Sequence, residues 1–299
     1  MMIMLTNVAQ GLLWAIMAIG VYLTFRVLNI ADMTAEGSFP LGAAISARLI
    51  VSGSNPIVAT LAGAAGGALA GVISGWLNTK LKIPDLLTGI LTMTGLYSVN
   101  LLIMKAANIS FLGHVKTVFN SVSAMSSLGG TIIFSSGLVL VLITSLVLFF
   151  RTEVGLAARA VGDNPLMSAA NGINTDRMKI IVYMISNSFI ALSGSLMAQT
   201  NGYADVSMGI GTLVIALSAI IMAEMVFHKS SLGKRFLTIV GGAIVYRWLI
   251  AGVLELGVDP NLLRLFYAVM LVLFLSIPRL DRRLARFFRS WFKKEEVSK

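Results

Sequence analysis

The chain has 299 residues, of which 57% are hydrophobic and only 12% are charged, with a formal net charge of +10. Because a soluble domain has roughly one-quarter charged residues, this composition excludes a soluble globular protein and indicates that lipid surrounds most of the chain. The chain contains no cysteine, which excludes disulfides, thiolate metal sites and a cysteine nucleophile. Its two histidines, His114 and His228, lie far apart in the sequence, so we expect no metal site.

Apolar runs of about 20 residues, the length that crosses a hydrocarbon core, recur along the whole chain. They predict an all-α fold, a polytopic helical membrane bundle of about nine spans. The spans are expected near 5–25, 36–52, 56–77, 84–104, 132–150, 180–200, 207–227, 236–256 and 262–277. The N-terminal segment has no Lys or Arg before Arg26, so it lacks the basic region of a cleaved signal peptide and we expect the first span to be retained.

The distribution of basic residues predicts the orientation of the bundle, since positive charge gathers on the cytoplasmic face. With about nine spans, most basic residues fall on one face. That face holds Arg26, Lys80, Lys82, the segment 151–179, Lys229, Lys234, Arg235 and the chain from Arg279 onward. We therefore expect the N-terminus outside the cell and the C-terminus inside.

Polar residues interrupt the apolar pattern at the start of the second span. Asn29, Asp32 and Glu36 are followed by Gly37 and Pro40, which break the apolar run. Irregular backbone at membrane depth occurs only where it is buried in protein or lines a wet cavity, so these residues are candidates for a translocation pathway. The alternative is an interfacial loop on the inner face.

A second polar interruption precedes the seventh span, where Tyr203 and Asp205 stand among Asn201, Gly202, Gly209 and Gly211. The same argument makes Tyr203 and Asp205 pathway candidates, although an outer interfacial loop is the better reading for Asp205. Asn100 and Asn187 add polar groups within spans four and six, where they line the pathway or only tie helices together.

The third span is rich in small residues, with Gly67, Gly71 and Gly75 spaced four apart. Such a row lets two helix backbones approach closely within a membrane. It predicts either a dimer seam or packing inside one subunit, and the second is favoured because a bundle of this size has many internal contacts.

Residues 151–179 form a charged island between two apolar runs. Val154, Ala157, Ala158 and Val161 recur at helical spacing, and the Asp163-Asn164-Pro165 triplet then ends the helix. A second short helix, 166–170, ends at Asn171-Gly172. This charged helix-turn-helix has the form of a docking element for a soluble partner; the alternative is an ordinary connecting loop.

The last residues, 280–299, are basic and amphipathic, with Leu280, Leu284 and Phe287 beside several arginines. They predict a cytoplasmic helix that lies on anionic lipids, and we prefer this to nucleic-acid binding. Residues 1–279 then form the membrane domain. The sequence has no phosphate loop, no HExxH and no GxSxG, so we expect no catalytic residue and no enzyme activity of its own.

The island sequence EVGLAARAVGDNPLMSAANGINTDRMK resembles the cytoplasmic loop of ABC-transporter permeases of the ribose and branched-chain amino-acid type. The motif is matched by Gly155, Arg159, Ala160, Gly162, Asn164, Gly172 and Ile173. Segments 26–47 and 205–224 are also similar to that family, and the likeness extends over roughly residues 20–275. Within it, the chain is most similar to a subgroup of uncharacterised permeases, some linked to aromatic amino acids. It departs from the ribose-type members in its span number and its long basic tail.

The resemblance implies the membrane-spanning subunit of an importer in a bacterial plasma membrane. Two permeases, expected to be identical, would form the pore. A separate ATPase subunit would bind ATP and magnesium, and an extracellular solute-binding protein would deliver a small polar solute. An amino acid, aromatic in particular, is the first expectation, and a sugar or nucleoside the second. The island would dock on the ATPase as a coupling element through Glu153, Gly155, Arg159, Ala160, Gly162, Asp163, Asn164 and Pro165.

Two alternatives come from other classes. An ion- or proton-coupled carrier would work without an ATPase and would place charged groups deep in its spans. Here Glu36, Arg48 and Arg247 are scattered, and no partner for them is evident in the sequence. A membrane scaffold or receptor without transport is the other alternative, and no feature of the sequence favours it.

Overall fold

The computed structural model describes residues 2–111, 117–119, 128–226, 232–255, 257, 259, 262–263 and 265–276. The described part is almost entirely helical, as predicted. Its α-helices are α1 (Met2–Tyr22), α2 (Ala35–Val51), α3 (Pro56–Lys80), α4 (Asp85–Met104), α6 (Leu128–Phe149), α7 (Glu153–Asp163), α8 (Pro165–Ala170), α9 (Thr175–Asn201), α10 (Thr212–Val226) and α11 (Leu232–Glu255). A π-helical turn, η1 (Leu23–Val27), extends α1, and a 3₁₀ turn, η2 (Val206–Gly209), precedes α10.

Seven of the described helical segments are long and apolar enough to cross a membrane. They are Met4–Val27, Pro56–Lys80, Asp85–Met104, Gly129–Phe149, Thr175–Asn201, Val206–Met225 and Leu232–Glu255. They coincide with seven of the predicted spans. The predicted spans 36–52 and 262–277 correspond to shorter helices, the 17-residue α2 and the apolar helix Leu265–Ser276.

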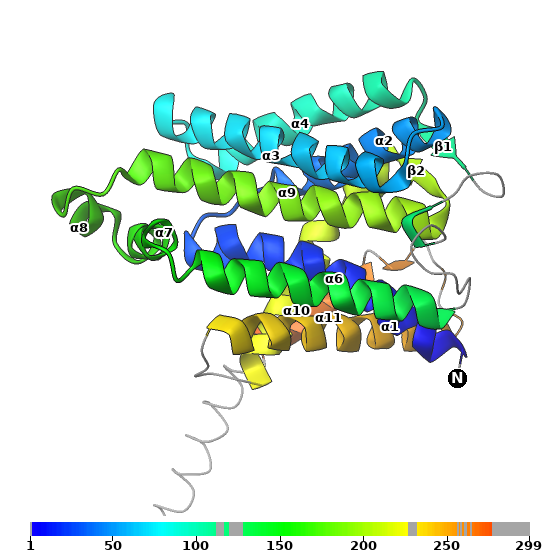
Figure 1. Ribbon diagram of the computed structural model, residues 1–299. Helices are drawn as coiled ribbons and strands as arrows, with labels where there is room; N and C mark the ends of the chain where they lie inside the picture. Colours follow the sequence, from blue (N-terminus) through cyan, green and yellow to red (C-terminus); the bar gives the residue numbers. More distant parts are fainter. Residues whose placement is uncertain are drawn as a thin grey trace, which may run out of the picture.

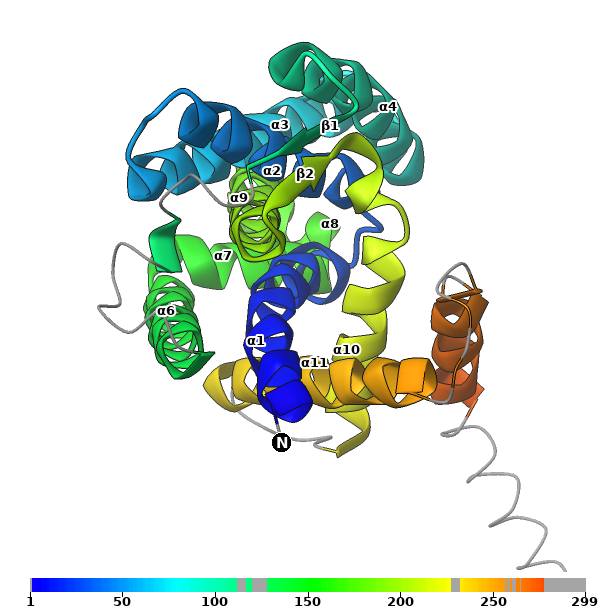
Figure 2. The ribbon, with the colours of Figure 1, turned by 90° about the vertical axis from the view of Figure 1, so that its right-hand side faces the viewer.

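The helices lie side by side, with α7 and α8 at one end of the bundle and the N-terminus at the other (Figure 1). The antiparallel pair of β1 (Asn108–Ser110) and β2 (Tyr203–Asp205), which we call the ribbon, lies at the same end as the N-terminus. We therefore call the two ends the island end and the ribbon end. Viewed along the bundle, α9 and α1 occupy the centre, and α2, α3, α4 and the ribbon lie together on one side (Figure 2). The predicted tail 280–299 lies outside the described residues.

The glycine row of α3 packs against α9 within the same chain. A Cβ at Gly71 would lie 2.3 Å from the carbonyl oxygen of Tyr183, and one at Gly67 would lie 2.4 Å from that of Asn187. Only glycine permits this approach of two helix backbones. Packing inside one subunit, the favoured prediction for this row, is therefore confirmed.

Helices α2 and α10 each begin inside the bundle rather than at its ends. α2 starts beside the middle of α9, where the Ser38 hydroxyl donates to Asn187 Oδ1 at 2.7 Å. α10 starts beside the first turn of α2, where Gly211 N donates to Glu36 Oε1 at 3.0 Å. With 17 and 15 residues, these helices are about 25 and 22 Å long, shorter than a hydrocarbon core of roughly 30 Å.

The first irregular segment differs in extent from the prediction. Residues 28–34 are non-helical and run from the island end to the middle of α9, whereas Gly37 and Pro40 lie within α2. Pro40 is the sixth residue of α2 and has no N–H to donate to the Glu36 carbonyl oxygen, and Gly209 packs closely against that oxygen.

Candidate functional site

The charged island forms two short helices with local caps. Thr152 Oγ1 accepts a hydrogen bond from Gly155 N at 3.3 Å and begins α7. Asn164 Oδ1 accepts from Met167 N at 3.0 Å and begins α8, with Pro165 at its first position. Gly172, at φ +80°, follows α8. The predicted helix-turn-helix is therefore present, except that residues 175–179 belong to α9.

The island is held against the end of α1. A Cβ at Gly162 would lie 1.6 Å from the carbonyl oxygen of Val27, so α7 touches the backbone there directly. Asn29, at φ +56°, donates from Nδ2 to the carbonyl oxygen of Gly162 at 3.1 Å. On its other side, a Cβ at Gly155 would lie 2.2 Å from the carbonyl oxygen of Phe149. Two of the predicted coupling residues, Gly155 and Gly162, thus position the island.

The remaining predicted coupling residues face outward. Glu153, Arg159, Asp163, Asn164 and Pro165 are exposed, and Ala160 is half-buried. Two apolar residues of α8 are also exposed, Leu166 at 85% and Met167 at 65%. Neither is among the predicted coupling residues. Their signal in the sequence is a pair of adjacent apolar side chains directly after Pro165, at the start of a short helix in a charged segment.

A buried polar cluster lies where the irregular segment meets α9. Asp32 Oδ2 accepts from Asn187 Nδ2 at 2.9 Å, and its Oδ1 accepts from Thr34 N at 2.9 Å. The Thr34 and Ser74 hydroxyls are 2.8 Å apart. Asp32 and Asn187 are almost fully buried. Asp32 is therefore buried beside the middle of α9 and is not exposed in a loop at an end of the bundle.

Glu36 joins the starts of α2 and α10. Its side chain accepts from Gly211 N, as described above, and a Cβ at Gly209 would lie 1.9 Å from the Glu36 carbonyl oxygen. A carboxylate at a helix N-terminus compensates the helix dipole. Asn100 of α4 also reaches this region, where its Nδ2 donates to the carbonyl oxygen of Gly37 at 3.3 Å.

Tyr203 and Asp205 lie apart from this cluster, in strand β2 at the ribbon end. Tyr203 is exposed, and Asn108 Nδ2 donates to Asp205 Oδ2 at 3.3 Å. Partial burial raises the pKa of Asp205, but hydrogen bonds from Ser207 and Asn108 outweigh it, so the pKa lies below its usual value. The structure thus brings Asp32, Glu36, Asn100 and Asn187 together near the centre and places Asn29 at the island end.

The amino-acid sequence of the chain matches a known family. A sequence profile described as "Branched-chain amino acid transport system / permease component" matches residues 3–275. The chain belongs to this family of ABC-transporter permeases. With seven long apolar helices among its described residues, the permease is a multi-pass protein of the bacterial plasma membrane. The carrier and scaffold alternatives are therefore set aside.

Several curated proteins are similar over most of their length. The "Tyrosine transport system permease protein" of Clostridioides difficile (strain R20291) is 40% identical over 91% of this chain and 90% of its own. An uncharacterized protein of Rickettsia prowazekii (strain Madrid E) is 31% identical over 94% and 99% of the two chains. The "Galactofuranose transporter permease protein YtfT" of Escherichia coli (strain K12) is 27% identical over 88% and 75%. No solved structure matches the chain significantly.

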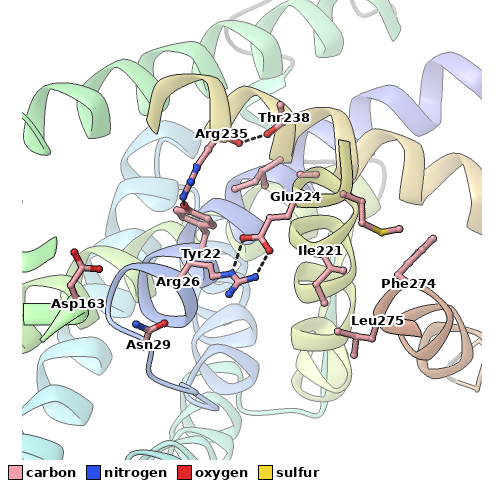
Figure 3. Close-up of a pocket in the computed structure, with 13 residues that line it drawn as sticks. Tyr22, Arg26, Asn29, Asp163, Ile221, Glu224, Arg235, Thr238, Phe274 and Leu275 are labelled. Carbon is pink, nitrogen blue, oxygen red and sulfur yellow. Dashed lines mark hydrogen bonds and ion pairs between the residues drawn. The ribbon is translucent and has the colours of Figure 1, made fainter. Parts of the chain in front are cut away.

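At its island end the permease has a pocket of about 590 Å³ beside an ion pair (Figure 3). Arg26 at the end of α1 forms two hydrogen bonds with Glu224 of α10, one of them Nε to Oε1 at 2.7 Å. Asp163 of the island lines the same pocket. Neither Arg26 nor Glu224 is among the site residues predicted from the sequence. In the predicted topology both residues lie near span ends on the same face of the bundle. This shared position is the only indication of the pair that the sequence contains.

Proposed function

We propose that the chain is the membrane-spanning subunit of an ATP-driven importer and that its translocation pathway runs along residues 28–36 and the starts of α2 and α10. A separate ATPase subunit supplies the energy and carries the ATP and magnesium. An extracellular solute-binding protein delivers the solute, and a second copy of the chain completes the pore. The family assignment and the geometry of the island support this proposal.

The observation that carries the proposal is the contact between the island and the irregular segment. α7 touches the backbone at Val27 and accepts a hydrogen bond from the Asn29 side chain, and three residues after Asn29, Asp32 is hydrogen-bonded to the middle of α9. A displacement of α7 therefore acts on Asp32 through a short, irregular stretch. Backbone outside regular helices bends more easily than a helix, which suits this segment to change conformation.

The exposed face of α8 suits the ATPase as a docking surface. Leu166 and Met167 are apolar and largely exposed beside the charged residues of α7. Apolar anchors surrounded by polar groups are the usual composition of a protein interface. We assign Glu153, Arg159, Asp163, Asn164 and Pro165 to the rim of this surface.

We propose about nine crossings, with the N-terminus outside and the C-terminus inside. Residues 28–34 and α2 together make the second crossing, which accounts for the short length of α2. The N-terminus and the island lie at opposite ends of the bundle, as this orientation requires (Figure 1). The basic tail would bind anionic lipids on the inner side.

The proposed solute is an amino acid with an aromatic side chain. The support is the 40% identity to a protein named as a tyrosine transport permease, over nearly the full length of both chains. A sugar is the second candidate, because permeases named for sugar transport are also related, at lower identity.

The proposal is tested by co-purification of the permease from gently solubilised native membranes. We expect an ATPase subunit to accompany the wild-type chain and to be lost from Leu166→Asp and Met167→Asp. The control is Val51→Asp, which places the same charge at an exposed apolar position of α2 near the ribbon end. No ATPase with the wild-type chain, or equal recovery with all variants, would contradict the proposal.

A further inference from the structure

A second pocket, of about 400 Å³, lies between α2, α4 and the segment that leads into α10. Its volume falls in the range of about 300–1,000 Å³ that small-molecule sites occupy. The lining residues are Glu36, Gly37, Pro40, Met93, Thr94, Tyr97, Asn100, Val206 and Ile210. The pocket thus adjoins the start of α2, where the proposed pathway passes.

Asn100 brings an unpaired acceptor to this pocket. Its side chain is fully buried, and its amide nitrogen donates to the carbonyl oxygen of Gly37. Its Oδ1 has no hydrogen-bond partner among the described residues. Because buried polar atoms in proteins are nearly always hydrogen-bonded, this oxygen points to a donor supplied by a ligand.

Glu36 brings a second acceptor. An ionised carboxylate has about four acceptor positions on its two oxygens. Oε1 accepts from Gly211 N, which leaves capacity on the carboxylate for a further donor. Among the described residues that line the pocket, Glu36 is the only charged one. The Thr94 hydroxyl donates to the carbonyl oxygen of Ile90 and one hydrogen of the Asn100 amide to Gly37, so the polar hydrogens left in this lining are the Tyr97 hydroxyl and the second Asn100 amide hydrogen, both of them neutral donors.

The rest of the wall is apolar or aromatic. This part of the lining consists of Pro40, Met93, Val206, Ile210 and the aromatic residue Tyr97. A wall of this kind buries an apolar or aromatic ligand body, and an aromatic ring also favours a nearby cation. The described lining has a carboxylate and an amide oxygen as acceptors and contains no basic side chain, so the pocket suits a positive ligand group rather than a negative one.

We propose that this pocket binds the protonated amino group of a small ligand through Glu36 and Asn100, with the ligand's apolar or aromatic body against Tyr97 and Met93. The inference rests on the proposed transport function and names the solute class that the pathway accepts, amines and amino acids with apolar bodies. It assigns recognition in the membrane domain to the amine and not to the carboxylate of an amino acid.

The chain's lack of cysteine permits a direct test with a single introduced thiol. Thr94→Cys places the thiol on the pocket wall, and Ser52→Cys places one at the exposed end of α2 as a control. The rates of modification are measured with cationic 2-aminoethyl and anionic 2-sulfonatoethyl methanethiosulfonate. We expect the cationic-to-anionic rate ratio at Thr94→Cys to exceed the control ratio about tenfold, and Glu36→Gln to bring it to the control value. Gln keeps a carbonyl acceptor for Gly211 N, so the contact with α10 is retained.

Protection by ligands gives a second readout that needs no further variant. Tyramine, which has the amine without the carboxylate, is expected to slow modification of Thr94→Cys at least fivefold. The matched acid, 3-(4-hydroxyphenyl)propionate, is expected to have no effect. Equal rate ratios at the two positions, or protection by the acid as strong as by tyramine, would overturn the inference. Recovery of the ATPase subunit is measured on the same preparations. If the ATPase is recovered but the pocket shows no preference for the amine, this inference is refuted and the proposed function is not.

Discussion

Gly162 of α7 lies so close to Val27 that a Cβ on the glycine would be 1.6 Å from the Val27 carbonyl oxygen. The Asn29 side chain closes the same contact through its hydrogen bond to Gly162. The island therefore holds the backbone at the start of the irregular segment, and Asp32, five residues after Val27, is anchored to Asn187 of α9. This short connection is the physical basis of the coupling proposed here.

Gly162→Ala should displace α7 from Val27 and lower the stability of the permease by about 1–3 kcal/mol, the usual cost of overpacking a close contact. Thermal unfolding in detergent measures this change. Gly137→Ala in α6 is the matched control, because nothing lies within 4 Å of a Cβ there. Equal melting temperatures for the two variants would refute the contact.

Asn187→Leu should lower the stability of the permease considerably, although leucine and asparagine side chains are similar in size. It leaves Asp32 Oδ2 and the Ser38 hydroxyl without their partner in a buried site. Losing the partner of a buried polar group costs about 1–3 kcal/mol, and more for a charged one. Asn108→Leu at the ribbon end, where Asn108 is exposed and its partner Asp205 is only partly buried, serves as the control and should lose under about 1 kcal/mol. Denaturation of both variants against the wild type measures the difference.

Gly71→Ala should separate α3 from α9. The new methyl group would meet the Tyr183 carbonyl oxygen at 2.3 Å, and backbone cannot easily move away. Gly66→Ala in the same helix meets only the terminal methyl of Ile45, which can change rotamer. We expect a loss of about 1–3 kcal/mol for the first and a much smaller loss for the second. If Gly66→Ala proved the more damaging, the packing of α3 on α9 would have to be reconsidered.

The ion pair of Arg26 and Glu224 should give a measurable but small coupling energy. Both side chains are partly exposed, at 43% and 33%, and such pairs contribute about 0.2–1 kcal/mol. A double-mutant cycle of Arg26→Gln and Glu224→Gln measures it by thermal unfolding. The same cycle with Asp163→Asn in place of Glu224→Gln should be additive. Additivity in both cycles would show that Arg26 and Glu224 do not interact in the membrane.

Local features of the fold were predictable from the sequence. Asn164 and Pro165 placed the turn between α7 and α8, because an N-cap and a proline at the first position define a helix start. The glycine spacing of α3 predicted close packing of helices, and the apolar runs predicted the long spans.

The candidate site was predictable only in part. Asp32 and Glu36 were recognised as polar residues in an apolar region, but their partners Asn187 and Gly211 lie 155 and 175 positions away in the sequence. No periodicity or local motif specifies contacts over such a separation. Leu166 and Met167 were not predicted for a different reason. Apolar residues are common throughout a membrane protein, so these two are recognised as a docking surface only when the structure shows that they are exposed.

The central claim is that the island transmits ATPase movement to the pathway through Gly162. Its most direct test compares thiol modification at Thr94→Cys in the purified complex, with and without a non-hydrolysable ATP analogue, in otherwise wild-type and Gly162→Ala chains. We predict that the analogue changes the modification rate severalfold in the wild-type background and has no effect with Gly162→Ala, although the ATPase still co-purifies. An equal change in both backgrounds would contradict the account.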